Sequence, residues 1–324
     1  MKEETKKEGI VKTLLSGKEK ADNEAMIDMM MKALKTVHSA IAVSDVTDPE
    51  ALAKQRAGHE RLSKLVTPAV GINYTKDEVE GIPVMWAVPG FAHRERPVIL
   101  YCHGGGYTGG GLGYAGILAG KMALHTGLPV FTFEYRLAPE NPYPAPLEDA
   151  MKMGDHLMYL GYGANDVIVA GDSAGGNMAL EIVLKLKSQK RMMPAGLILF
   201  SPWTDMTATL PSYEKYKDTD PMLTYEYVCG SRSAYAGSET DYTDPFLSPL
   251  YGDLDDMPPT LIEVGSNEIL RNDSEYLHKK LQKNGCLSRL HVYSGGWHVF
   301  QVLPTVKAAR AMDDVNDFIR EAKL

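Results

Sequence analysis

The chain has 324 residues, of which 44% are hydrophobic, and it carries a formal net charge of −8. This length fits one large α/β domain or two smaller ones, and the apolar content is enough to fill a sizeable core, which excludes intrinsic disorder. The excess of acids argues against a protein that holds nucleic acid or an anionic membrane through a basic surface.

The N-terminal part of the chain, residues 1 to about 65, reads as helical, because apolar residues recur at helical spacing from 25–31 onward. Its first twenty residues are charged throughout and lack the apolar centre of a signal peptide. No stretch of the chain approaches the roughly 18 apolar residues of a membrane span. Three cysteines without Cys-x-x-Cys spacing predict neither a disulfide framework nor a zinc site. We therefore expect a cytoplasmic protein.

From Pro83 onward, short β-rich runs alternate with helical patterns, which predicts βαβ units. The strand candidates are 83–88, 97–103, 129–135, 167–171, 196–201, 260–264 and 289–293. Helices are expected near 114–126, 145–160, 174–190, 273–284 and 304–322. Several strand candidates are continuously apolar, as expected when helices cover both faces of a sheet. The predicted fold class is α/β, with a mostly parallel central sheet flanked by helices.

One segment, residues 205–247, breaks this alternation. It separates two strand candidates by far more than the usual connection between such elements. An insertion beyond the end of a strand is where a lid or cap over a site would lie.

The motif GDSAGG, residues 171–176, stands between a strand candidate and a helix candidate. A serine on such a sharp turn exposes its hydroxyl above the sheet, and the crowded turn needs small residues at Gly171 and Gly175. This makes Ser173 a candidate nucleophile. By itself the motif is a weak signal, since a turn rich in glycine and serine is often only a turn.

A second motif, HGGG at residues 103–106, ends an earlier strand candidate. Successive glycines let the backbone bend so that their N–H groups converge on one developing oxyanion. The alternative is an ordinary flexible loop. The order HGGG and then GxSxG is far more specific than either motif alone.

The third motif is GGWHVF, residues 295–300, which follows the last strand candidate. His298 lies downstream of both the serine and the acidic candidates, where an α/β hydrolase places its general base. A lone histidine is more often structural, and the other eight histidines lack this context. His103 starts the glycine loop and is expected to orient it.

Six motifs together resemble the hormone-sensitive-lipase-like family of α/β-hydrolase esterases, in register over about residues 80–320. They are HGGGY (103–107), EYRLAPE (134–140), YPAPLEDA (143–150), GDSAGGN (171–177), SPWTD (201–205) and SPLYGDLDDMPPTLIEVGSNEILRNDS (248–274). The resemblance implies an α/β-hydrolase fold with a helical cap. Residues 1–65 would be cap helices and 66–324 the catalytic domain, interrupted by a cap insertion at about 206–245.

The same resemblance implies a carboxylesterase with Ser173 as nucleophile and His298 as base. The implied oxyanion hole consists of the N–H groups of Gly105, Gly106 and Ala174, with Gly104 shaping the loop. Tyr107 and Trp203 are expected near the substrate pocket. Eight further side chains either line an acyl pocket or pack the cap onto the main domain: Met26, Met29, Met30, Met31, Tyr213, Tyr216, Tyr225 and Tyr227.

The third member of the triad has two candidates, Glu268 and Asp273. The family usually has an Asp-Pro-Leu run where this chain has Glu-Ile-Leu from residue 268. Glu268 follows a strand candidate after a short turn, which places it at the edge of the sheet that carries the serine. The presence of an acid at Asp273 can also be explained structurally. It would lie in the first turn of a helix, where an acid favours the helix dipole, with Asn272 as N-cap and Glu275 as its capping partner. We favour Glu268, and Asp273 remains the alternative.

These residues predict hydrolysis of a small-molecule ester, with short acyl chains implied by the family, through an acyl-enzyme that needs no metal or organic cofactor. An amidase or a deacetylase would use the same machinery. A non-catalytic small-molecule receptor is a further alternative; plant gibberellin receptors resemble the family but lack the histidine that this chain has at position 298. Homodimers are common for such folds, although no residue pattern here demonstrates one.

Overall fold

The computed structural model describes residues 48–65, 68–90 and 97–324. The chain divides into two units, Met1–Ala40 and Ile41–Leu324, and the described residues all belong to the second. The helices expected before residue 48, with the four methionines assigned to the cap, lie outside the described residues.

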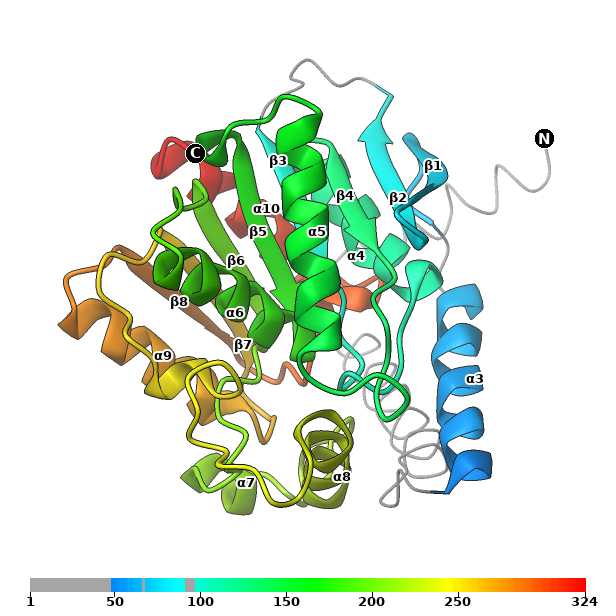
Figure 1. Cartoon of the computed structure of the whole chain (residues 1–324), viewed down its shortest axis with the longest axis vertical. Coiled ribbons are helices and arrows are strands. Elements are labelled where there is room, and N and C mark those ends of the chain that lie inside the picture. Colours follow the sequence, from blue (N-terminus) through cyan, green and yellow to red (C-terminus); the bar gives the residue numbers. More distant parts are fainter. Residues whose placement is uncertain (1–47, 66–67, 91–96) are drawn as a thin grey trace, which may run out of the picture. The chain divides into compact units, whose positions relative to one another are not determined.

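Within the described ranges, eight strands form a single sheet with the order β1-β2-β4-β3-β5-β6-β7-β8 (Figure 1). The strands are β1 (Ile72–Val79), β2 (Ile82–Pro89), β3 (Val98–Cys102), β4 (Val130–Phe133), β5 (Val167–Asp172), β6 (Gly196–Phe200), β7 (Thr260–Gly265) and β8 (Ser288–Tyr293). The β1–β2 and β2–β4 pairs are antiparallel, and all other pairs are parallel. The prediction of a mostly parallel α/β sheet is confirmed.

Helices cover both faces of this sheet. They are α3 (Pro49–Leu65), α4 (Leu112–Thr126), α5 (Ala145–Tyr159), α6 (Ala174–Ser188), α7 (Pro211–Lys215), α8 (Tyr225–Ala236), α9 (Arg271–Lys283) and α10 (Val306–Glu321), with 3-10 turns η1 (Ala164–Asp166), η2 (Pro249–Tyr251) and η3 (Phe300–Val302). Helices α4 and α10 pack together on one face, and α5 and α6 lie on the other (Figure 1). None of the helices in this part of the chain has the length and apolar character needed to span a membrane.

The central strands and the covering helices follow from their residue patterns. Every residue of β3, β5, β6 and β7 is buried, as expected for strands that helices cover on both sides. Helix α10 is amphipathic, and its buried residues recur at three- and four-residue spacing from Ala308 to Ile319. It begins after Thr305, whose hydroxyl accepts a hydrogen bond from the N–H of Ala308 at 3.1 Å.

Strand β1 is missing from the sequence prediction, which was wrong at this point. Its sequence, INYTKDEV, contains mostly polar residues, and only Ile72 is buried in the structure. β1 is the outermost strand and is hydrogen-bonded on one side only, to β2. An edge strand with so little buried surface lacks the apolar run by which the inner strands were recognised.

The insertion contains α7 and α8, and α3 contacts it. Gln55 of α3 donates to the Thr108 hydroxyl at 3.1 Å and to the Tyr227 hydroxyl of α8 at 3.3 Å. Arg56 donates from Nε to the Thr108 carbonyl at 2.9 Å. Helix α3 is therefore bonded both to the insertion and to the loop that follows β3.

Candidate active site

Ser173 occupies the sharp turn between β5 and α6, with φ 56° and ψ −120°. A positive φ is strained for a residue with a side chain, so the surroundings must hold it in place. The N–H of Ser173 donates to Phe200 at 2.9 Å, and its carbonyl accepts from Trp203 at 3.0 Å. A Cβ on Gly175 would lie 2.1 Å from the carbonyl oxygen of Cys102. The turn therefore closes only because the second residue of α6, Gly175, is a glycine that packs directly against β3.

Three side chains from distant parts of the chain meet at this turn. His298 Nε2 lies 2.9 Å from Ser173 Oγ, and His298 Nδ1 lies 2.8 Å from Glu268 Oε2. Their exposed fractions are 9% for Ser173, 5% for His298 and 0% for Glu268. With the proton on Nδ1 donated to Glu268, Nε2 is left to accept the proton of the serine hydroxyl. The arrangement is that of a nucleophile, a base and an acid that orients the base.

The second oxygen of Glu268 is also held. Glu268 Oε1 accepts from the Ser201 hydroxyl at 2.9 Å and from the N–H of Gly265 at 2.6 Å. Ser201 Oγ in turn accepts from the N–H of Val299 at 3.2 Å. Ser201 thus connects the Glu268 carboxylate to the backbone N–H of Val299, the residue after His298. Ser201 begins the family motif SPWTD, but nothing in the sequence indicates this role for it.

Asp273 lies elsewhere. Its Oδ1 accepts from the N–H groups of Thr204 at 2.8 Å and Asp205 at 3.0 Å, and it forms no hydrogen bond to His298 within the described residues. Burial and the charge of Asp205 raise the pKa of Asp273 well above its ordinary value. Of the two candidate acids, only Glu268 contacts the imidazole.

The prediction that Asn272 is the N-cap of the helix containing Asp273 was wrong. Helix α9 begins at Arg271, one residue before the expected N-cap, Asn272. The Asn272 side chain instead accepts from the N–H of Ser212 at 2.8 Å and donates to Glu275 at 2.8 Å. It joins α9 to α7 because the nearby backbone of α7 offers a donor that the local sequence did not reveal.

The glycine loop is tied to the residue before the serine. Asp172 is fully buried, and its Oδ1 accepts from the N–H of Gly104 at 2.8 Å. The hydroxyls of Tyr101 and Tyr114 also donate to this carboxylate, at 2.5 Å and 2.7 Å. Asp172 therefore links the serine turn to the loop after β3, a role that no local pattern in the sequence indicates. His103 contacts the same loop, with Nδ1 2.8 Å from the Gly104 carbonyl oxygen.

Three backbone N–H groups beside the serine have no acceptor within the described residues: those of Gly105, Gly106 and Ala174. Gly105 has φ +120°, and a Cβ there would lie 2.3 Å from the Gly109 carbonyl oxygen, so the loop bends in a way that requires glycine. Ala174 is the first residue of α6, whose unpaired N–H groups favour a negative charge. These amides are available to stabilise an oxyanion, while the Gly104 N–H is occupied by Asp172.

The electrostatic environment favours a charged His298. Burial lowers the pKa of His298, but the hydrogen bond and charge of Glu268, with the charges of Asp220 and Asp172, outweigh it, so the pKa is raised above 6.5. Asp220 comes from the insertion and is itself buried, which raises its pKa to about 6. Its Oδ2 accepts from the N–H of Ile269 at 2.8 Å, next to Glu268. The insertion thus contributes a carboxylate to the site.

The two residues expected near the substrate pocket are buried and bonded to protein. Tyr107 stacks on Tyr235 with ring centroids 3.6 Å apart, and its hydroxyl donates to Asn177 at 2.7 Å. Trp203 donates from Nε1 to the Asp205 carbonyl at 3.2 Å. Their assignment to the pocket stays a prediction. The contacts seen here hold in place the loop that contains Tyr107 and the loop that contains Trp203.

The cap tyrosines differ in their surroundings. Tyr213 is buried and Tyr225 is 43% exposed. Tyr227 faces the glycine loop, because a Cβ on Gly106 would lie 2.8 Å from its hydroxyl and 2.7 Å from that of Ser231. Helix α8 therefore forms a wall directly beside the candidate oxyanion hole.

One group of potential metal ligands occurs within the described residues. A ligand atom from each of Glu263, His291 and Asp314 lies within 4.8 Å of the others. The Tyr293 hydroxyl joins the two carboxylates, at 3.1 Å from Glu263 and 2.5 Å from Asp314. We interpret the group as a hydrogen-bonded network between β7, β8 and α10.

Comparison with known proteins agrees with this geometry. A family described as the alpha/beta hydrolase fold matches residues 99–302. An esterase of Acinetobacter venetianus is 35% identical over 68% of this chain and 74% of its own length. An acetyl-hydrolase of Streptomyces hygroscopicus is 31% identical over 73% of this chain and 79% of its own.

Solved structures give the same result. An esterase from the bacterial hormone-sensitive lipase family superposes with a TM-score of 0.80 and 31% identity, covering 89% of this chain and 97% of that one. A hormone-sensitive lipase homologue from a metagenome library gives a TM-score of 0.82 and 30% identity, covering 91% and 98%. The chain therefore belongs to the hormone-sensitive-lipase-like family of α/β hydrolases and is a carboxylic ester hydrolase.

Proposed function

We propose that this enzyme is a serine carboxylesterase that hydrolyses short-chain acyl esters through an acyl-enzyme. Ser173 is the nucleophile, His298 the general base and Glu268 the acid that orients the imidazole. The observation that carries the proposal is the unbroken chain of contacts from Ser173 Oγ through His298 to Glu268, at 2.9 Å and 2.8 Å.

In the acylation step, Ser173 Oγ attacks the ester carbonyl while His298 Nε2 takes the hydroxyl proton. Glu268 stabilises the imidazolium that forms and keeps Nδ1 protonated. Negative charge develops on the carbonyl oxygen, and the N–H groups of Gly105, Gly106 and Ala174 receive it. Removing one such donor in a related mechanism costs about 2.7–4 kcal/mol of transition-state stabilisation.

In the second step, the alcohol leaves with the proton from His298 and the acyl group stays on Ser173. Water then attacks the acyl-enzyme, His298 takes its proton, and the carboxylic acid is released. Both steps use side chains and backbone amides of this chain alone.

We propose that α3, α7 and α8 form a cap that limits the acyl group to short chains. The support is the wall that Tyr227 and Ser231 place against Gly106, together with the bonds from Gln55 of α3 to that region. The acetyl-hydrolase among the relatives is consistent with a small acyl group. It also favours a second candidate, a deacetylase acting on an acetylated small molecule with the same residues.

Substitution of the three residues tests the mechanism. Ser173→Ala should abolish ester hydrolysis and leave the fold intact by circular dichroism. Glu268→Gln should lower kcat by several powers of ten, because it removes the charge that stabilises the imidazolium, whereas Asp273→Asn should have a far smaller effect. Wild-type turnover by Ser173→Ala would refute the proposal, and the opposite ranking of the two acids would transfer the role to Asp273.

The substrate class needs a separate measurement. A series of p-nitrophenyl esters of increasing acyl length, with the matching anilides and an acetylated sugar, should give the highest kcat/KM for short esters. A preference for anilides would indicate an amidase, and a preference for the sugar would indicate the deacetylase. Labelling by a fluorophosphonate, blocked in Ser173→Ala, separates all of these from a non-catalytic receptor.

A further inference from the structure

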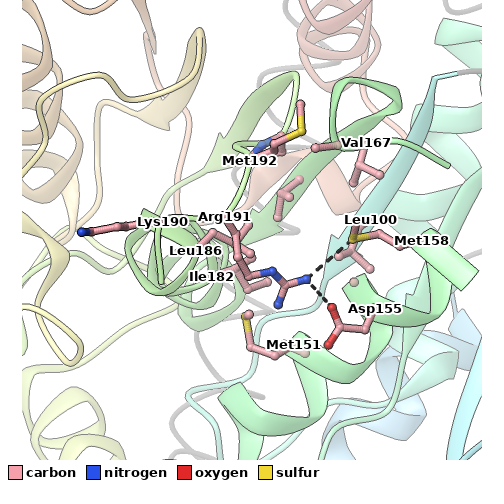
Figure 2. Close-up of a pocket in the computed structure, with 15 residues that line it drawn as sticks. Leu100, Met151, Asp155, Met158, Val167, Ile182, Leu186, Lys190, Arg191 and Met192 are labelled. Carbon is pink, nitrogen blue, oxygen red and sulfur yellow. Dashed lines mark hydrogen bonds and ion pairs between the residues drawn. The ribbon is translucent and has the colours of Figure 1, made fainter. Parts of the chain in front are cut away.

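A cavity lies between α5 and α6, over the inner strands of the sheet (Figure 2). Its volume is about 340 Å³, at the small end of the roughly 300–1,000 Å³ range of small-molecule sites. Val167 lines the cavity and begins β5, whereas Ser173 follows the end of that strand. The cavity and the catalytic serine therefore lie at opposite ends of β5.

The interior of this cavity is apolar. Leu100 and Val169 contribute from the sheet, Ile182 and Leu186 from α6, and Met151 from α5. Unbranched methionine side chains adapt to ligands of irregular shape. The lining thus suits a flexible hydrocarbon chain.

The mouth of the cavity exposes large apolar side chains to solvent. Met158 is 49% exposed and Met192 is 68% exposed, and both line the cavity. Tyr159 and Leu160, which follow Met158, are 86% and 46% exposed. Met158 and Met192 are therefore exposed apolar side chains that adjoin a cavity, which makes them more informative than isolated ones.

The charged residues that line the cavity are two cations and one acid: Lys190, Arg191 and Asp155. The Arg191 guanidinium lies between Asp155 and Met158, donating through Nη2 to Asp155 and to Met158 Sδ at 3.6 Å (Figure 2). Its Nε and Nη1 groups donate to no residue in the described part of the chain. The ion pair is partly exposed and contributes little to stability, so a ligand can compete for the guanidinium.

We propose that this cavity binds a medium-chain carboxylate, with its hydrocarbon tail between α5 and α6 and its carboxylate on Arg191. The Nε and Nη1 groups of Arg191, which have no acceptor in the described part of the chain, can donate to a single anionic head. The tail occupies the apolar interior. Binding here requires neither Ser173 nor the cap, so it stands independently of the catalytic mechanism.

Methionine methyl signals provide a local measure of binding. In protein labelled with ¹³C at the methionine methyls, titration with octanoate should shift the signals of Met151, Met158 and Met192 saturably, each assigned by its Met→Leu variant. Octanol should bind about tenfold more weakly, and Arg191→Gln should weaken octanoate about tenfold without affecting octanol. Equal affinity for octanol and octanoate would overturn the assignment of an anionic ligand.

Gly154 allows the cavity to be filled by a single substitution. It lines the cavity on α5, and no atom lies within 4 Å of where its Cβ would stand. Gly154→Phe should abolish the octanoate-induced shifts, whereas Gly154→Ala, the matched control, should retain them. Unchanged hydrolysis of p-nitrophenyl acetate by both variants would show that the fold is intact.

Three outcomes would overturn the proposal. The first is no shift at the three methionines up to the solubility of octanoate. The second is an unchanged affinity in Gly154→Phe that still hydrolyses ester. The third is a change in the mass of the assembly in solution when Gly154 is substituted, which would mean that a second copy of the chain occupies the mouth of the cavity.

Discussion

At the scale of single residues, His298 is surrounded by acids from three different parts of the chain. Glu268 contacts the ring, while Asp220 from the insertion and Asp172 from the serine turn act through their charge. All three favour the protonated imidazole against the effect of burial. The His298 imidazole therefore has a higher pKa than an ordinary histidine, which bears on the pH dependence expected if it is the base.

The raised pKa of His298 predicts the acid limb of the pH profile. Catalysis needs the neutral ring, so kcat/KM should fall as the pH decreases, with a midpoint above the ordinary histidine value of 6.5. The residual activity of Glu268→Gln should show this limb at lower pH, because the largest favourable contact of the imidazolium is gone. Profiles of kcat/KM for p-nitrophenyl acetate provide the test, and a wild-type midpoint below 6.5 would contradict it.

At the scale of elements, the site depends on how closely α6 approaches β3. The serine turn leaves no space for a side chain at Gly175, whose Cβ would meet the Cys102 carbonyl oxygen at 2.1 Å. Gly171 and Gly175 also face each other, since a Cβ on Gly171 would lie 2.0 Å from the Gly175 carbonyl oxygen. The proposed nucleophile, Ser173, is therefore positioned by backbone packing as much as by its own conformation.

Gly175→Ala should lower the free energy of unfolding by about 3 kcal/mol, because α6 must move away from β3 to admit the methyl group. The control is Gly154→Ala in the middle of α5, where a Cβ meets nothing within 4 Å. There the better helix propensity of alanine should raise stability by about 0.5–1 kcal/mol. Urea unfolding of the two variants measures the difference, and similar stabilities would show that the turn tolerates a side chain.

At the scale of the whole molecule, a buried acid makes stability depend on pH. Glu263 is fully buried between β6 and β8, and burial raises its pKa to about 8. In the unfolded chain a glutamate has a pKa of about 4.3. Between these two values the folded state binds more protons than the unfolded state, so stability falls as the pH rises through this window.

Replacing Glu263 with the neutral isostere should remove this dependence. Glu263→Gln is expected to raise Tm relative to wild type at pH 8.5 and above, where the wild-type carboxyl must be charged in its buried site, and to change it little at pH 5. Thermal unfolding at a series of pH values measures the effect. A Tm difference between the two proteins that does not vary with pH would refute the assignment.

The amino-acid sequence determined the fold class and most of the elements. Inner strands that are buried on both faces are apolar throughout, and amphipathic helices repeat at their own period, so both are recognisable locally. Ser173, the glycine loop and His298 could also be recognised from the sequence. Each lies in a short motif whose glycines indicate a tight turn of the backbone. Strand β1 was not predicted because it is an edge strand with mostly polar, exposed side chains.

Only the tertiary structure decided which acid contacts His298 and what holds that acid in place. Glu268 and Asp273 are five residues apart, and the sequence favours Glu268 without excluding Asp273. In the structure they have different partners, His298 and the Thr204 backbone. Ser201 bonds to Glu268 from 67 positions away, and Asp172 bonds to Gly104 from 68 positions away. Such contacts arise when parallel strands bring their ends to one edge of the sheet, and no local pattern records which side chains meet there.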